Sequence, residues 1–90
     1  MEFEWDSAKG RSNVSKHGFD FMDARQVFDG RPRLDIESPR GDEHRTLSIA
    51  MLNEVLIAVT WTRRSEDTVR LISVRRARRA EDRKYRQIYG

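Results

Sequence analysis

Arginine side chains cluster near the C-terminus of this 90-residue chain, and arginine is well suited to binding phosphate. The series follows an apolar run and comprises Arg75, Arg76, Arg78, Arg79, Arg83, Lys84 and Arg86. Residues 63–90 hold ten Lys/Arg and four Asp/Glu, whereas residues 1–62 hold eight and eleven. A concentrated basic field attracts polyanions, so this layout predicts nucleic acid as a partner. The alternative is a solvated helix face with its own ion pairs, because Glu81 and Asp82 lie inside the series.

A second arginine pair, Arg63-Arg64, follows the apolar run over residues 55–61. If this run pairs antiparallel with the one before Arg75, Arg64 and Arg75 lie at opposite ends of the strand pair. The exposed sheet face then carries a basic track. Such side chains suit RNA cleavage, because the substrate's own 2′-hydroxyl attacks and the protein must orient it and stabilise the charged phosphorane. No cofactor is needed, and the candidate acids and bases are His17, Glu43, His44, Glu66 and Tyr85.

Most of these acid–base candidates also have a structural explanation. His17 stands at the end of an expected helix, where a cation interacts favourably with the helix dipole. Glu43, His44 and Glu66 fit the ordinary polarity of strand edges and loops. Both interpretations stay open at this point, and the identity of the base is not assigned.

Composition excludes several other classes of protein. There is no cysteine, so disulfides and thiolate metal sites are impossible and a cytoplasmic location is expected. The sequence shows no signal peptide, no apolar run long enough to cross a membrane, no His/Asp/Glu spacing typical of a metal site and no Gly-rich nucleotide loop. Its length predicts a single domain over residues 1–90.

The pattern of apolar residues predicts an α+β fold in the order β-α-α-β-β-β-β-α. Asp6 and Gly18 bound a first helix over 7–17, and Asp20 begins a second with an apolar stripe at Phe21, Ala24, Val27 and Phe28. The expected strands cover 2–5, 33–37, 45–52, 55–61 and 69–74, with a two-residue hairpin turn at 53–54, and a last helix covers 79–89. The helices are expected against one face of a largely antiparallel sheet. In the last helix, Ala80, Tyr85, Ile88 and Tyr89 are expected to pack inward.

The sequence resembles the BrnT family, the toxin half of a type II toxin–antitoxin pair. The matching positions run through nearly the whole chain in the family's order and spacing. They are Trp5, Asp6, Lys9, Asn13, Lys16-His17-Gly18, Phe21, Ala24, Val27-Phe28-Asp29, Glu43, Arg45, Thr62, Arg64, Arg70, Ile72-Ser73, Arg75, Ala77, Glu81 and Tyr85.

This resemblance implies a RelE-like fold, ribonuclease activity that arrests translation, and a BrnA-like antitoxin related to ribbon-helix-helix DNA-binding proteins. Two toxins are expected on an antitoxin dimer, and the complex is expected to repress its own operon by binding operator DNA. Carried over by position, Arg64 and Arg75 are the leading groups for phosphate chemistry, with Arg79 beside them and His17 and Tyr85 as secondary catalytic candidates. The expected RNA-binding side chains are Arg63, Arg76, Arg78 and Lys16.

Three positions depart from the family pattern. Ala50 and Val74 replace small residues and imply packing adjustments. Arg78 stands where a Thr or Ser often caps the last helix, which is expected to weaken the helix start by about 1 kcal/mol. Two other functions remain open: a non-catalytic nucleic-acid-binding module that uses the Arg-rich helix, and an interaction protein that docks an acidic partner.

Overall fold

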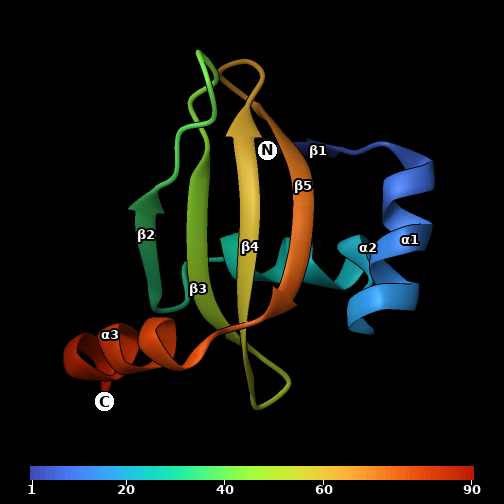
Figure 1. Cartoon of the computed structure of the whole chain (residues 1–90). Helices are drawn as coiled ribbons and strands as arrows, with labels where there is room; N and C mark the ends of the chain where they lie inside the picture. Colours follow the sequence, from blue (N-terminus) through green and yellow to red (C-terminus); the bar gives the residue numbers. More distant parts are fainter.

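The structure, a computed structural model, describes all residues 1–90 and contains one five-stranded sheet with helices around it (Figure 1). The elements are β1 (Glu2–Glu4), α1 (Ser7–His17), α2 (Phe21–Ala24), η1 (Arg25–Phe28), β2 (Arg33–Glu37), β3 (Thr46–Leu52), β4 (Val55–Arg63), β5 (Thr68–Arg76) and α3 (Arg79–Tyr89). The strand order is β1-β5-β4-β3-β2, with β1 parallel to β5 and every other pair antiparallel. This confirms the predicted α+β fold and element order. The helices are all too short, and too polar, to span a membrane.

Helix α1 begins and ends where its capping residues predict. The Asp6 carboxylate accepts hydrogen bonds from the backbone N–H groups of Ala8 (2.8 Å) and Lys9 (3.2 Å). These bonds lower the pKa of Asp6, since they favour its charged form. At the other end Gly18 adopts a left-handed conformation with φ of 77°, and its N–H donates to the Val14 carbonyl at 2.9 Å.

The second predicted helix is instead two short pieces. Asp20 caps α2 by accepting from the Met22 N–H at 2.8 Å, but the chain tightens into the 3₁₀ turn η1 after Ala24. Phe21, Ala24 and Val27 are the buried residues of this segment. Their spacing is three residues, which matches the turn of a 3₁₀ helix better than the 3.6 residues of an α-helix.

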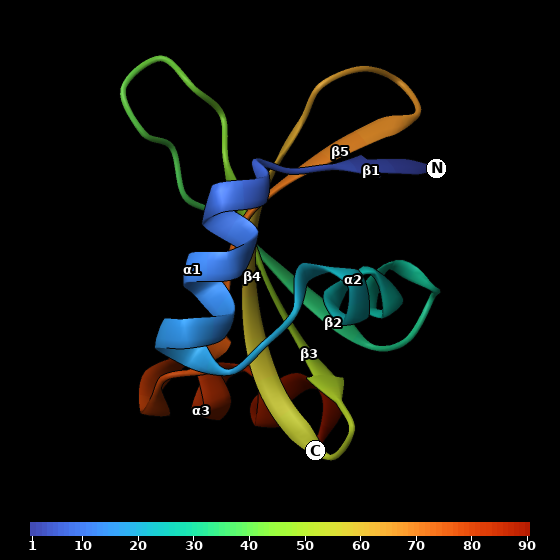
Figure 2. The ribbon, with the colours of Figure 1, turned by 90° about the vertical axis from the view of Figure 1, so that its right-hand side faces the viewer.

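The helices do not all lie on one face of the sheet, so that prediction was wrong. Figures 1 and 2 show α2 and α3 on opposite sides of the sheet, with α1 along the β5 edge. The larger core joins α2 and η1 to one sheet face, through side chains such as Ile57 and Val59. The smaller core packs Tyr85 of α3 against Ile49, Leu56 and Ala58 on the other face. Central strand β4 is apolar on both faces, and each face therefore needs its own cover.

Only part of the predicted apolar face of α3 is buried. Tyr85 is in the core, but Ala80 is exposed and Ile88 and Tyr89 are 58% and 45% exposed. The Tyr89 hydroxyl donates to the Arg33 carbonyl at 3.1 Å, which ties the end of α3 to edge strand β2. Ile88 and Tyr89 thus leave apolar surface exposed at the end of α3.

The hairpin that joins β3 to β4 sets the register of the central sheet. Asn53 and Glu54 form the predicted two-residue connection, and both have positive φ angles of 50° and 68°. Beyond the turn, β4 continues to Arg63, and β5 runs from Thr68 to Arg76, so both strands extend further than predicted. Arg63 and Arg76 therefore lie within strands and not after them.

A buried amide attaches α1 to the sheet. The Asn13 side chain donates to the carbonyls of Val74 (2.8 Å) and Phe19 (2.9 Å) and accepts from the Val74 N–H (3.0 Å). It thereby satisfies both backbone groups of a buried residue of β5, as a neighbouring strand would. This contact fixes the face of α1 that carries Lys9 and Lys16.

Candidate functional site

The antiparallel pairing of β4 and β5 separates the two leading arginines. Ala58 lies opposite Arg75 near one end of the strand pair, and Arg63 lies opposite Val69 at the other. Arg64 follows directly after Arg63, so the prediction that Arg64 and Arg75 occupy opposite ends is confirmed. The two guanidinium groups belong to different surroundings and are treated separately.

Arg75 is engaged in a two-pronged ion pair with Glu81 of α3. Its Nη1 and Nη2 atoms lie 2.8 and 2.9 Å from the two carboxylate oxygens, and the side chains are only 20% and 14% exposed. The hydrogen bonds raise the pKa of Arg75 and lower that of Glu81, because each favours the charged form of its partner. This arginine links the end of β5 to the start of α3. Both of its Nη groups donate to Glu81, so they are not free to bind a phosphate.

Glu81 also supports the helix start that lacks a Thr or Ser cap. Its Oε1 atom accepts from the Arg78 backbone N–H at 2.8 Å, the reciprocal half of a capping box. The expected weakness at Arg78 is thus partly compensated by a residue three positions further on.

The remaining predicted residues of the C-terminal region divide by exposure. Tyr85 is 5% exposed and belongs to the smaller core. Arg76, Arg78 and Arg79 are exposed and form no ion pair with any acidic side chain. They form a basic corner where β5 turns into α3.

Lys16 and His17 lie on a second surface, beside α1. A pocket of about 170 Å³ between α1 and β5 is lined by Lys9, Ser12, Asn13, Lys16, His17, Ile72 and Ser73. Both lysines are exposed and free of ion pairs. This groove brings two cations and two hydroxyl groups together, which are groups that bind phosphate and sugar oxygens.

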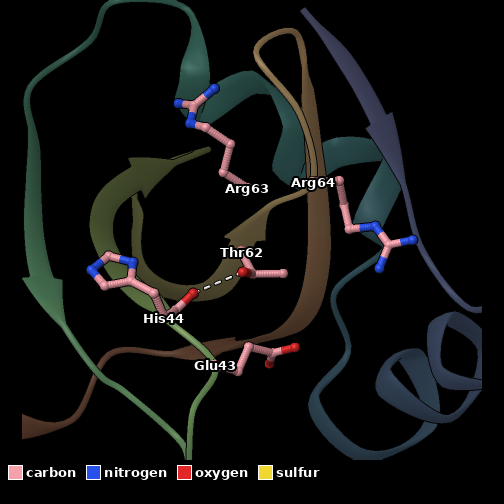
Figure 3. A pocket seen from close by; sticks show the side chains of 5 residues that line it. All are labelled: Glu43, His44, Thr62, Arg63 and Arg64. Atoms are coloured by element: carbon pink, nitrogen blue, oxygen red, sulfur yellow. Dashed lines mark hydrogen bonds between the residues drawn. The ribbon is translucent and has the colours of Figure 1, made fainter.

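The polar pocket, as we call the cavity of about 440 Å³ lined by Glu43, His44, Thr62, Arg63 and Arg64, opens at the end of the sheet where β4 finishes (Figure 3). Its lining contains no apolar side chain. The Thr62 hydroxyl donates to the His44 carbonyl at 2.7 Å and so holds the two sides of the pocket together.

A tight turn positions the acidic side of the polar pocket. Arg40 and Glu43 exchange backbone hydrogen bonds of 2.9 and 3.0 Å across Gly41 and Asp42. Gly41 has a φ of 60°, which glycine tolerates at the first central position of a hairpin turn. The segment between the strands expected at 33–37 and 45–52 thus contains a tight turn that holds the Glu43 backbone in place.

The two arginines of the polar pocket differ in how far they are engaged. Arg63 lies over the Trp61 ring at 5.7 Å and donates to the Glu66 carbonyl at 3.2 Å. Arg64 is 57% exposed, and its Nε atom is 3.7 Å from Glu4, whose carboxylate oxygen already accepts from Arg70 at 2.5 Å. Figure 3 shows the two side chains pointing apart. Arg64 therefore keeps most of its donors available at the pocket.

The acid–base candidates of the polar pocket have different partners. His44 Nε2 lies 3.2 Å from the Glu37 carboxylate, and both side chains are largely exposed. Glu43 pairs with Arg45, and this hydrogen bond lowers the pKa of Glu43, assisted by the charges of Lys9 and Arg64. Sequence reasoning named Glu43 but did not place it beside Arg64. The structure brings them to one pocket because Glu43 lies shortly before β3 and Arg64 directly after β4, at the end of the strand pair where Thr46 lies opposite Trp61.

The comparisons with known proteins agree with this fold. Residues 5–81 match the family described as the ribonuclease toxin, BrnT, of type II toxin–antitoxin systems. The 1.1 Å crystal structure of the Brucella abortus ribonuclease toxin BrnT is similar, with a TM-score of 0.69 and 29% sequence identity over 88% of this chain and 99% of that chain. No match appears among curated proteins.

These matches define a ribonuclease toxin of a type II toxin–antitoxin system. The chain belongs to the BrnT family, as its sequence pattern predicts. A toxin of this type implies an antitoxin as its partner.

Proposed function

We propose that this toxin is a metal-independent endoribonuclease that acts in the cytoplasm and arrests translation by cleaving RNA. The substrate supplies the nucleophile, its own 2′-hydroxyl, so the protein needs to align that oxygen with the phosphorus and stabilise the charge that develops. Arginine donors aimed at the non-bridging oxygens meet the second need.

The observation that carries this proposal is the state of Arg64. It is more than half exposed, only weakly paired, and lines an entirely polar cavity of about 440 Å³. The sequence makes Arg75 an equal candidate, but its Nη1 and Nη2 atoms donate to the Glu81 carboxylate at 2.8 and 2.9 Å. We therefore propose that Arg64 binds the reacting phosphate and that Arg75 holds α3 in place through Glu81.

Flanking nucleotides would be bound by the other exposed cations. Arg63 lines the same polar pocket as Arg64, and Lys16 and His17 line the separate groove beside α1. Arg76, Arg78 and Arg79 extend the basic surface at the opposite end of β5. Phosphate contacts of this kind supply affinity without sequence preference. Tyr85 is buried, and we assign it to packing.

The antitoxin partner is proposed to be BrnA-like, with a ribbon-helix-helix DNA-binding part that represses the operon. The face of the sheet that α3 covers only partly is a fitting place for it, because Leu34, Ile36 and Leu47 are only partly buried there and Ile88 is 58% exposed. Apolar side chains at a surface rimmed by charge are typical of protein interfaces. Two toxins on an antitoxin dimer would then be the assembled form, measurable as mass by light scattering of the mixture.

Expression in bacteria tests the role of Arg64. Arg64→Ala is expected to stay folded and to lose growth inhibition and RNA cleavage. Arg83→Ala removes an exposed, unpaired arginine from α3 and is the matched control, which should remain toxic. A folded Arg64→Ala variant that arrests growth like the wild type would contradict the assignment.

The basic corner at Arg76, Arg78 and Arg79 favours a second candidate function, nucleic-acid binding without cleavage. Its three unpaired guanidinium groups lie far along β5 from the polar pocket. Binding that falls steeply with salt, while the RNA stays intact, would support this second function over the first.

A further inference from the structure

The Glu43 carboxylate in the polar pocket uses only one of its two oxygens in hydrogen bonding. Glu43 Oε1 accepts from Arg45 Nε, whereas no hydrogen bond involves Oε2. The side chain is 48% exposed and lines the same cavity as Arg64. Its backbone is fixed by the reciprocal bonds with Arg40 across the tight turn. A held carboxylate with one free oxygen is suited to accepting a proton from a bound hydroxyl.

Three cations act on the charge of Glu43. Arg45, two residues further along the chain, pairs directly with the carboxylate, and the charges of Arg64, after β4, and Lys9, in α1, act with it; all three lower the pKa of Glu43. Arg40 is its backbone partner in the turn. His44, the next residue, is directed away to Glu37. These cations favour the charged carboxylate, which is the form that can accept a proton.

We propose that Glu43 is the general base of the ribonuclease reaction, with Oε2 taking the proton of the substrate's 2′-hydroxyl while Arg64 holds the phosphate. The O2′–P bond forms and the P–O5′ bond breaks. The leaving 5′-oxygen takes a proton from solvent water, and the hydroxide so formed takes the proton from Glu43, which gives a 2′,3′-cyclic phosphate, a 5′-hydroxyl end and the original carboxylate. This assignment rests on the proposed ribonuclease function of the same site.

The other acid–base candidates fit this role less well. His44 points away from Arg64 in Figure 3 and pairs with Glu37. His17 lines the groove beside α1, and Tyr85 is buried in the smaller core. Glu43 is the carboxylate that shares the polar pocket with Arg64.

Cleavage of a short RNA by purified protein tests the assignment. Glu43→Gln keeps the size and an acceptor for Arg45, and it should lower the cleavage rate about 10²–10⁴-fold while leaving RNA binding and thermal unfolding nearly unchanged. Glu37→Gln, which removes the carboxylate beside His44, is the matched control and should cleave like the wild type. Protein circular dichroism confirms that each variant is folded.

The pH dependence separates proton transfer from a purely structural role. The cleavage rate of the wild type should fall at acidic pH as Glu43 becomes protonated. The pH–rate profile of Glu43→Gln should lack this acidic limb. Removing the cation in Arg45→Met raises the pKa of Glu43, so the limb should move to higher pH. A Glu43→Gln variant with the wild-type rate and pH profile overturns the role of Glu43 alone. Wild-type protein that binds RNA without cleaving it overturns the ribonuclease proposal as well.

Discussion

Replacing Glu81 with alanine should destabilise the protein by about 2–3 kcal/mol. The residue makes two hydrogen bonds to Arg75, at 2.8 and 2.9 Å, and the pair is 20% and 14% exposed. An exposed ion pair contributes at most about 1 kcal/mol, whereas breaking a fully buried one costs about 3–5 kcal/mol, and this pair lies between those cases. For a domain of this size such a loss lowers the melting temperature by roughly 10–20 °C.

A double-mutant cycle with thermal or urea unfolding measures this contribution. Arg75→Ala and Glu81→Ala should each be destabilised, and the double variant should be little worse than either, with a coupling energy of about 1–3 kcal/mol. Asp82→Ala is the matched control. Asp82 follows Glu81 in the same helix, but its ion pair with Arg86 is exposed to solvent. Additive effects of the two alanines would refute the structural role of Arg75.

Lowering the pH should remove the contribution of the Arg75–Glu81 ion pair to the stability of the fold. The pKa of Glu81 is lowered in the folded protein, chiefly by its hydrogen bonds to Arg75. The stabilisation is therefore fully present above the ordinary pKa of 4.5 and is lost as the pH falls through the lower folded value. The gap in stability between the wild type and Glu81→Gln should accordingly shrink in acid, as measured by urea unfolding at a series of pH values.

Two further substitutions test how the fold is held. Asn13→Ala leaves both backbone groups of Val74 without partners and should cost about 2–4 kcal/mol in urea unfolding, whereas exposed Ser12→Ala should be nearly neutral. An unchanged midpoint for Asn13→Ala would contradict the proposed link between α1 and β5. Glu54→Gly relieves a φ of 68° in the hairpin turn and should raise stability by about 0.5–1 kcal/mol. A lower melting temperature for this variant would show that the turn is not strained.

Local chemistry explains what could be predicted of the fold. Asp6 and Gly18 bound α1 as expected, because capping depends on neighbours within a few residues. The side of the sheet taken by α3 was predicted wrongly, since β4 is apolar on both faces and does not by itself choose between them. The three-residue spacing from Phe21 to Val27 was present in the sequence, but it was interpreted as an α-helical stripe.

The site was predictable only in part, for a different reason. The sequence placed Arg64 and Arg75 at opposite ends of a strand pair, because antiparallel pairing follows from short connections. It did not show that Arg75 meets Glu81, since this depends on how the chain turns from β5 into α3. It did not show that Glu43 and Arg64 line one pocket, since this depends on the turn between Arg40 and Glu43 as well as on the pairing of β3 with β4.

The most direct test of the central claim is cleavage of RNA by the purified toxin in excess EDTA. The proposal predicts that cleavage continues at the same rate and leaves 2′,3′-cyclic phosphate and 5′-hydroxyl ends. Arg64→Ala should be slower by about 10²–10³-fold, the usual loss when one donor to a developing oxyanion is removed. Cleavage that stops with EDTA and returns with added Mg²⁺, or an Arg64→Ala variant as fast as the wild type, would contradict the account.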